Sequence, residues 1–232
     1  MNEPTSSDTG RFGPSPNPLT PLFPLQSVLF PGGLLPLRIF EVRYLDMIGR
    51  CHKAGQPFGV VCLTEGRDVL QPATGKAAPS GEAFVREAFM PVGTLAVIDE
   101  LERPQPGLMM IRCSGTQRFR LKSSEKLKHG LWVGDLEPIA ADAVVPVPDD
   151  LAATRSALQK LLLQIEQSVE HASQMPVQGP WQWDDCGWLA NRWCELLPLA
   201  AEVKHRFMAL DNPLLRLELV ADALDQMGFK LP

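Results

Sequence analysis

Two side chains in the sequence are of the types that a cysteine hydrolase uses. Cys194 and His205 could supply a nucleophile and its base, because an imidazole activates a neighbouring thiol. Cys194 lies in an apolar segment typical of a helix, however, and a thiol buried in a core is inert. The sequence contains neither the G-x-S-x-G elbow of serine hydrolases nor a G-x-x-x-x-G-K-[ST] phosphate loop. We therefore predict that the protein has no catalytic residues.

Residues that bind metals are not spaced as a metal site requires. The sequence has no C-x-x-C or H-E-x-x-H motif, which would position ligands for zinc. Its odd number of scattered cysteines fits reduced thiols in a cytoplasmic protein: Cys51, Cys62, Cys113, Cys186 and Cys194. We interpret the acidic pairs Asp149–Asp150 and Asp184–Asp185 as helix caps. The sequence therefore predicts no metal and no other cofactor.

Six basic residues lie close together and are opposed within residues 112–128 only by Glu125: Arg112, Arg118, Arg120, Lys122, Lys126 and Lys128. One interpretation is a basic face that binds RNA. The alternation of Arg118 and Arg120 with Phe119 favours another, in which the basic side chains form the solvent-facing side of a strand. Phe119 would then point the other way, which serves base stacking poorly. The net charge of −5 also argues against nucleic-acid binding over the whole surface.

A charged cluster ends the apolar stretch "VLFPGGLLPLRIF" and begins the segment after it. It consists of Arg38, Glu41, Arg43 and Tyr44. Glu41 stands where a helix is predicted to begin, and the helix dipole favours a carboxylate there. It could pair with Arg38 as a structural clasp. The alternative is that the four side chains rim a groove that grips a peptide.

Two tryptophans, Trp181 and Trp183, precede a predicted helix in the segment "WQWDDCGWLANRW". Exposed tryptophans are favoured anchors in protein interfaces, so both are candidates for contact with a partner. The alternative is that the two rings fold back and fill the space between two domains.

Prolines and glycines divide the first part of the chain into short runs typical of strands. These runs are 34–40, 58–63, 82–90, 94–102, 108–115, 117–123 and 130–139. One helix is predicted from Glu41 to Cys51, and Gly55 is available to end it. We expect Phe23, Phe30 and Phe40 to be buried, and Pro36 to lie at a bulge or an unpaired strand edge because it cannot donate a ladder hydrogen bond. Seven strands with turn signals favour a closed or nearly closed antiparallel β-barrel.

The second half of the chain has the 3.6-residue period of helices. One long helix is predicted after Asp149–Asp150, and another follows Asp184–Asp185 and ends before Pro198. The last predicted helix has Asn212 as its N-cap and Pro213 in its first position. Its inward-facing side chains are Leu217, Val220, Leu224 and Met227. Such apolar stripes need partners, so a small helical bundle is expected.

These patterns predict an α+β protein with four parts. Residues 1–18 are polar and rich in proline and are expected to form a disordered tail. Residues 19–140 form the barrel domain with its one helix, residues 141–149 a linker stiffened by proline, and residues 150–232 the helical bundle domain. No apolar run reaches the roughly 18–20 residues needed to span a membrane, and no secretory signal is recognisable. We therefore expect a cytoplasmic protein without a membrane partner.

Several motifs occur in one characteristic order over roughly residues 20–228: "PLFPLQSVLFPGGLLPLRIFEVRYLDMI", "FGVVCLTEG", "GTLAVIDELE", "GLMMIRCSGTQRFRL" and "LANRWCELLPL…DNPLLRLELVADAL". Together they resemble the N-terminal substrate-binding domain of the Lon protease family. The resemblance implies a PUA-like antiparallel β-barrel followed by a C-terminal helical bundle. Complete Lon enzymes also carry an ATPase module and a protease module with a serine–lysine dyad, whereas this chain stops at Pro232. We therefore expect a stand-alone domain without peptidase or ATPase activity.

The resemblance also implies a non-catalytic module that recognises polypeptide segments or another protein, as an adaptor or a binder of unfolded segments. An exposed apolar groove would be compatible with a homodimer as well. The alternative function is RNA binding through residues 112–128, because PUA-like barrels of other families bind RNA. Salt dependence distinguishes the two functions, since phosphate contacts weaken steeply with ionic strength.

Overall fold

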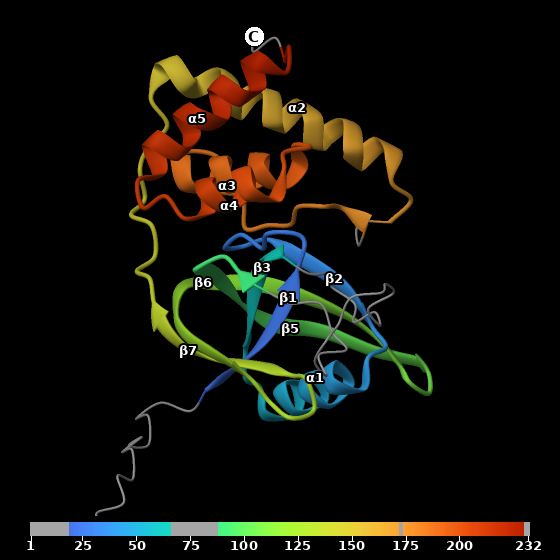
Figure 1. Ribbon diagram of the computed structural model, residues 1–232. Coiled ribbons are helices and arrows are strands. Elements are labelled where there is room, and N and C mark those ends of the chain that lie inside the picture. The colour runs from blue at the N-terminus through green and yellow to red at the C-terminus, as the bar shows by residue number, and fades with distance from the viewer. Residues whose placement is uncertain (1–18, 66–87, 172–173, 230–232) are drawn as a thin grey trace, which may run out of the picture.

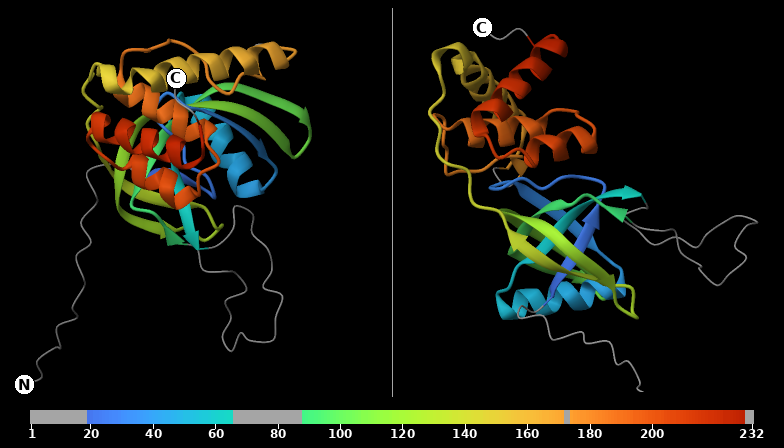
Figure 2. Two further views of the ribbon diagram at one scale, coloured as in Figure 1. Left: turned by 90° about the horizontal axis from the view of Figure 1, so that it is seen from above. Right: turned by 60° about the vertical axis from the view of Figure 1, so that its left-hand side comes forward.

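The computed structural model describes residues 19–65, 88–171 and 174–229. A β-barrel and a helical bundle lie one above the other, and the chain passes between them along one side (Figure 1). Seen from above, the helices lie across one end of the barrel (Figure 2). The predicted α+β class, a barrel followed by C-terminal helices, is confirmed. The predicted tail at 1–18 and most of the predicted strand at 82–90 lie outside the described residues.

Five of the described strands close the barrel, in the order β1, β7, β6, β5, β3 and back to β1, while β2 pairs with β6 and β4 with β3. The strands are β1 Thr20–Leu25, β2 Leu34–Ile39, β3 Phe58–Glu65, β4 Ala88–Phe89, β5 Val92–Gln105, β6 Leu108–Lys126 and β7 Trp132–Pro138. The pairing of β1 with β3 is parallel, and the other described pairings are antiparallel. The sequence pattern does not predict β1, because Pro21 and Pro24 interrupt it.

The long strand β6 pairs with three other strands. Its first half pairs with β2 and β5, and its second half pairs with β5 and β7. The sequence predicts two strands here, 108–115 and 117–123, but the chain continues as one. Register shifts against β5 and β7 bend it, for example between Thr94 and Ala96 of β5.

A glycine-rich loop between β1 and β2 docks against the middle of β6. The Gly32 N–H donates to the Gly115 carbonyl oxygen at 2.7 Å, and the Gly115 N–H donates to the Gly33 carbonyl oxygen at 2.8 Å. A Cβ at Gly115 would lie 2.2 Å from the carbonyl oxygen of Phe30, so only glycine permits this approach. The "FPGG" stretch is therefore a fixed part of the barrel wall beneath the bundle.

Helix α1, Val42–Ala54, lies at the end of the barrel opposite the bundle (Figure 1). Tyr44 and Ile48 are buried on its barrel side. Gly55 ends the helix in the left-handed conformation, with φ of 61°, as predicted. The prediction that Phe40 is buried is wrong: its side chain is 55% exposed because it lies where the chain leaves β2.

Four helices form the bundle in the described part of the chain: α2 Ala152–Ser168, α3 Cys186–Leu196, α4 Ala201–Met208 and α5 Pro213–Gln226. Every residue of α3 from Cys186 to Cys194 is buried, so this helix lies at the centre. The Asp185 carboxylate accepts two N–H groups of its first turn, as predicted. Asn212 likewise caps α5 by accepting the Leu215 N–H at 3.2 Å, with Pro213 at the start of the helix.

Two predictions at helix ends are wrong. Asp149 and Asp150 do not cap α2, because they belong to a short 3₁₀ helix, η1 (Asp149–Leu151), that precedes it. Met227 is 40% exposed rather than inward-facing, since the helix has ended and the chain turns at Gly228.

Buried arginines join the barrel to the bundle. Arg118 on β6 donates from Nη1 to the carbonyl oxygens of Met208 at 2.8 Å and Leu210 at 3.0 Å. Its Nη2 donates to Asp142 Oδ1 at 2.8 Å, and Nη1 of Arg216 on α5 donates to Asp142 Oδ2 at 2.6 Å. The two arginine side chains are only 4% and 1% exposed. One carboxylate in the connecting segment is therefore shared by two buried guanidinium groups.

Arg192 makes a second attachment, from α3 to the glycine-rich loop. Its Nη2 donates to the Pro31 carbonyl oxygen at 2.8 Å, and its Nη1 donates to the Gly32 carbonyl oxygen. The same guanidinium pairs with Glu195 at 2.8 Å. A Cβ at Gly33 would lie 2.1 Å from the Glu195 carboxylate, so a larger residue here would displace that side chain from its pair with Arg192.

Apolar contacts also join the two parts at the seam, by which we mean the contact surface between barrel and bundle. Phe30 and Val92 of the barrel belong to the same core cluster as Trp193 and Leu197 of the bundle. The bundle is therefore held on the barrel by apolar burial together with the arginine contacts.

We predict that Asp142→Asn lowers the free energy of unfolding by about 3 kcal/mol, because it leaves buried Arg216 without an anionic partner and leaves buried Arg118 with only the exposed carboxylate of Asp211. Urea denaturation followed by circular dichroism measures the change. The matched control is Glu100→Gln, which removes the carboxylate that pairs with Arg112 on the exposed barrel surface and should cost less than about 1 kcal/mol. Equal effects of the two variants would show that the Asp142 cluster is not a buried ionic contact.

We also predict that native protein reacts with almost no Ellman's reagent at about pH 8, whereas protein in guanidinium chloride releases five equivalents. All five cysteines are buried and free. Burial raises the pKa of Cys113 and Cys194 to about 12 and that of Cys186 to about 11, so these thiols stay protonated at the pH of the assay. Rapid reaction of any thiol in the native state would contradict this prediction.

Candidate functional site

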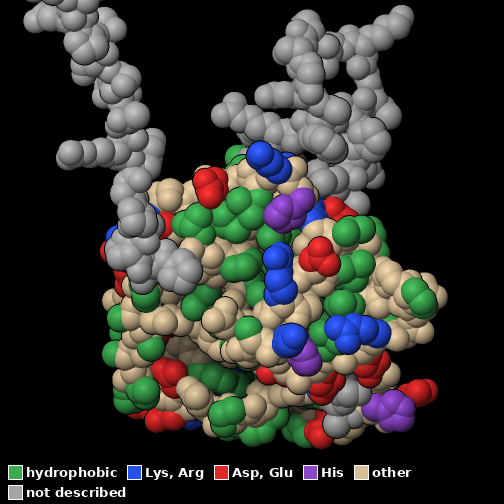
Figure 3. All heavy atoms as spheres, turned by 90° about the horizontal axis from the view of Figure 1, so that it is seen from below, with side chains coloured by type: hydrophobic (Ala, Val, Ile, Leu, Met, Phe, Trp, Pro, Cys, Tyr) green, Lys and Arg blue, Asp and Glu red, His purple; other side chains and the backbone are tan. Residues whose placement is uncertain are grey.

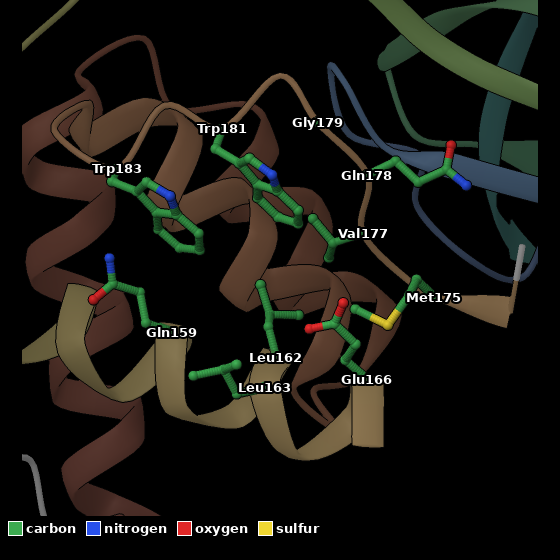
Figure 4. Close-up of a pocket in the computed structure, with 10 residues that line it drawn as sticks. All are labelled: Gln159, Leu162, Leu163, Glu166, Met175, Val177, Gln178, Gly179, Trp181 and Trp183. Carbon is green, nitrogen blue, oxygen red and sulfur yellow. The ribbon is translucent and has the colours of Figure 1, made fainter. Parts of the chain in front are cut away.

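A pocket of about 640 Å³ lies on the bundle between α2 and the chain segment that leads into α3 (Figure 4). We call it the α2 pocket. Its lining residues are Gln159, Leu162, Leu163 and Glu166 on α2 and Met175, Val177, Gln178, Gly179, Trp181 and Trp183 in the segment. Apolar side chains thus form most of the walls, together with two amides and one carboxylate.

The α2 side of the pocket is one face of a helix. Its residues follow one another at i, i+3, i+4 and i+7 from Gln159, which places them in adjacent turns on the same side. Leu162 is buried in the core, whereas its neighbour Leu163 is 55% exposed. The 3.6-residue apolar period of the long helix predicted after Asp149–Asp150 includes Leu162 but neither Leu163 nor Glu166. An apolar residue directly beside the stripe was the available signal.

The opposite wall is aromatic. The rings of Trp181 and Trp183 stack with centroids 5.2 Å apart and an angle of 6° between their planes. Both rings meet Trp188 edge to face, at 6.0 and 5.1 Å. Trp188 is buried at the start of α3 and packs against both rings, while Trp181 remains 46% exposed. Such supported rings are held in place before any partner arrives.

The structure contradicts the hypothesis that Trp181 and Trp183 fill the space between barrel and bundle. Both face α2 inside the bundle. A separate cavity of about 440 Å³ does lie between the domains, and there Trp188 is the tryptophan that lines it, near Gly32 and Arg118. The two predicted interface residues therefore lie together on one accessible pocket.

The charged cluster after β2 is mostly internal. Arg43 is buried, donates from Nη1 to the Gly130 carbonyl oxygen at 2.6 Å, and lies 4.4 Å from the ring centre of buried Tyr44. Glu41 pairs with Arg43 at 2.9 Å, not with Arg38 as predicted. Arg38 lies apart, on β2. This geometry suits a clasp between α1 and the β6–β7 loop better than the rim of a groove.

The basic residues 112–128 do not form one exposed face. The expectation that Arg118 faces solvent is wrong, since the bundle covers that part of β6 and buries the guanidinium. Arg112 pairs with Glu100, and Lys122 lies 3.4 Å from Glu137. The other members have separate positions: Arg120 and Lys128 are exposed, and Lys126 lies over the ring of Trp132 at 5.5 Å.

The barrel end of the molecule shows a similar mixture of charges. Lys, Arg and His side chains on this face lie among Asp and Glu side chains and hydrophobic ones (Figure 3). This view presents no continuous basic surface of the kind that follows a phosphate backbone.

Cys194 and His205 do not form a reactive pair among the described residues. Cys194 is fully buried, and burial is the main cause that raises its pKa to about 12. The Nε2 atom of His205 lies 3.0 Å from the Val92 carbonyl oxygen, and burial lowers the pKa of the imidazole. Within the described ranges no cluster of three His, Cys, Asp or Glu side chains could hold a metal ion. The described helices are also too short or too polar to cross a bilayer.

Comparisons with known proteins agree with this architecture. A crystal structure of a Lon N-terminal domain protein from Xanthomonas campestris matches with 27% identity and a TM-score of 0.63, over 93% of this chain and 100% of that one. The N-terminal domain of the Lon protease from the Mycobacterium avium complex matches with 14% identity and a TM-score of 0.53, over 92% and 100% of the two chains. At that identity the second likeness supports the fold alone.

The sequence comparisons are more specific. No curated protein matches the chain. The profile of the family described as the "ATP-dependent protease La (LON) substrate-binding domain" matches residues 20–226, which include the barrel strands and all the bundle helices described above. The chain therefore belongs to the Lon substrate-binding domain family.

Proposed function

We propose that this protein is a non-catalytic module that binds polypeptide segments, as an adaptor or a binder of unfolded chains, and that the α2 pocket is where it binds them. The observation that carries the proposal is the stacked pair Trp181–Trp183, which remains accessible above an apolar floor. The family's description as a substrate-binding domain supports the same class of ligand.

The chemistry of the pocket suits a side chain of an unfolded segment. Leu163 and Trp181 expose apolar surface on opposite walls, and burying that surface would supply most of the affinity. Gln159 and Gln178 supply amide groups that can bond the backbone of an extended chain. Because the aromatic wall is supported by Trp188, little side-chain entropy is lost on binding.

RNA is a poorer fit to this pocket. Bases could stack on an indole, but the carboxylate of Glu166 would lie against a phosphate backbone that carries the same charge. The basic residues 112–128 are divided between buried, paired and exposed positions.

We predict that Trp181→Ala raises the dissociation constant for an unfolded polypeptide by about 30-fold, because a central interface aromatic contributes about 2 kcal/mol. The probe is a fluorescein-labelled polypeptide that has been reduced and alkylated so that it cannot refold. Fluorescence anisotropy measures binding at low and at high salt, and an RNA oligomer of mixed sequence is tested in parallel.

Phe40→Ala is the matched control, because Phe40 is also an exposed aromatic residue but lies beside the charged cluster at the far end of the barrel. It should bind the polypeptide as the unaltered protein does. Loss of binding in Phe40→Ala and not in Trp181→Ala would move the site to residues 38–44. Salt-sensitive binding of RNA without binding of polypeptide would overturn the proposal in favour of nucleic acid.

A further inference from the structure

We propose that the α2 pocket selects segments in which a lysine or arginine lies close to a large apolar residue, with Glu166 as the group that reads the basic side chain. This inference rests on the proposed function and adds the chemical class of the segment. Among the described residues that line the pocket, Glu166 is the one that carries a charge.

The position of Glu166 supports a direct role. It is an exposed residue on the same face of α2 as Leu162 and Leu163, and its carboxylate points from the helix towards the aromatic wall (Figure 4). In the part of the chain that the structure describes, Glu166 has no ion pair and no hydrogen-bond donor to its carboxylate. An incoming cation would therefore find this carboxylate without displacing an internal partner.

The spacing of Leu163 and Glu166 is similar to the spacing of alternate side chains in an extended segment. Leu163 and Glu166 are neighbours one turn apart on α2, about 5 Å along the helix axis. In an extended chain, side chains i and i+2 point to the same side and are about 7 Å apart. An apolar side chain placed against Leu163 therefore brings the residue two positions away to the carboxylate of Glu166.

The aromatic wall strengthens the preference for a cation. The outer face of an indole attracts a guanidinium or an ammonium, and the aliphatic stem of a lysine or arginine packs on apolar surface. Trp181 is the more exposed member of the stacked pair. A basic side chain that reaches Glu166 can thus lie along Trp181, whereas an acidic one meets a like charge. The net charge of −5 adds a weak general attraction for basic segments.

A charge-exchange experiment tests this inference. Two short unstructured Gly/Ser-rich peptides carry one central Phe-Gly-Arg or Phe-Gly-Glu sequence and are otherwise identical. We expect the unaltered protein to bind the Arg peptide at least about fivefold more tightly at low salt. The difference should shrink in about 1 M NaCl, where the screening length is about 3 Å. The variant Glu166→Lys should reverse the preference and bind the Glu peptide more tightly.

Glu218→Lys is the matched control, because it makes the same charge change at an exposed position on α5, away from the pocket lining. It should keep the preference for the Arg peptide, and thermal unfolding by circular dichroism verifies that both variants are folded. Equal binding of the two peptides by the unaltered protein, with binding still lost in Trp181→Ala, would overturn this inference and leave the proposed function standing. If neither peptide nor the unfolded polypeptide binds, both proposals fail.

Discussion

Removing an arginine side chain from water is tolerated only when its guanidinium group is paired, and the arrangement of the two domains depends on this requirement. Arg118, Arg192 and Arg216 all lie at or near the seam between barrel and bundle with at most 4% of each side chain exposed. Their partners are backbone carbonyl oxygens, the Asn191 side-chain oxygen and the carboxylates of Asp142, Glu195 and Asp211. Because each guanidinium has donors fixed in a plane, satisfying them sets the orientation of the bundle as well as its attachment.

The features that sequence reasoning predicts well are local in the chain. Asn212 with Pro213 marks the start of α5, Asp185 the start of α3 and Gly55 the end of α1, because each signal acts on backbone groups a few residues away. The error at Arg118 depends on contacts between distant segments. The alternation of residues along β6 predicts that Arg118 faces solvent. In the folded protein the end of α4 and the chain that leads into α5 cover that position.

The candidate site divides in the same way. Residue type alone makes Trp181 and Trp183 candidates, because exposed tryptophans are favoured anchors in protein interfaces. Leu163 is apolar and stands beside the stripe of α2, but nothing local indicates that this loop lies over it, and so the part that Leu163 and Glu166 take in the pocket could not be assigned from the sequence. Once the loop is placed, the pocket is compact in sequence: all its lining residues fall within 159–183. The lining of the pocket can therefore change through one short segment, while the barrel and the seam stay as they are.

The attachment of Arg192 to the glycine-rich loop has a consequence for how such sequences diverge. Its acceptors there are main-chain oxygens of Pro31 and Gly32, which any residue would supply. An exchange of Pro31 therefore leaves its acceptor in place, whereas position 32 favours glycine for a different reason, since its φ is 72°. Relatives that keep this junction need not show covariation between the arginine and the residues it contacts. The residues that this junction restricts are instead Arg192 itself and the two glycines: Gly32 through its φ of 72°, and Gly33 because a Cβ there would displace the Glu195 carboxylate.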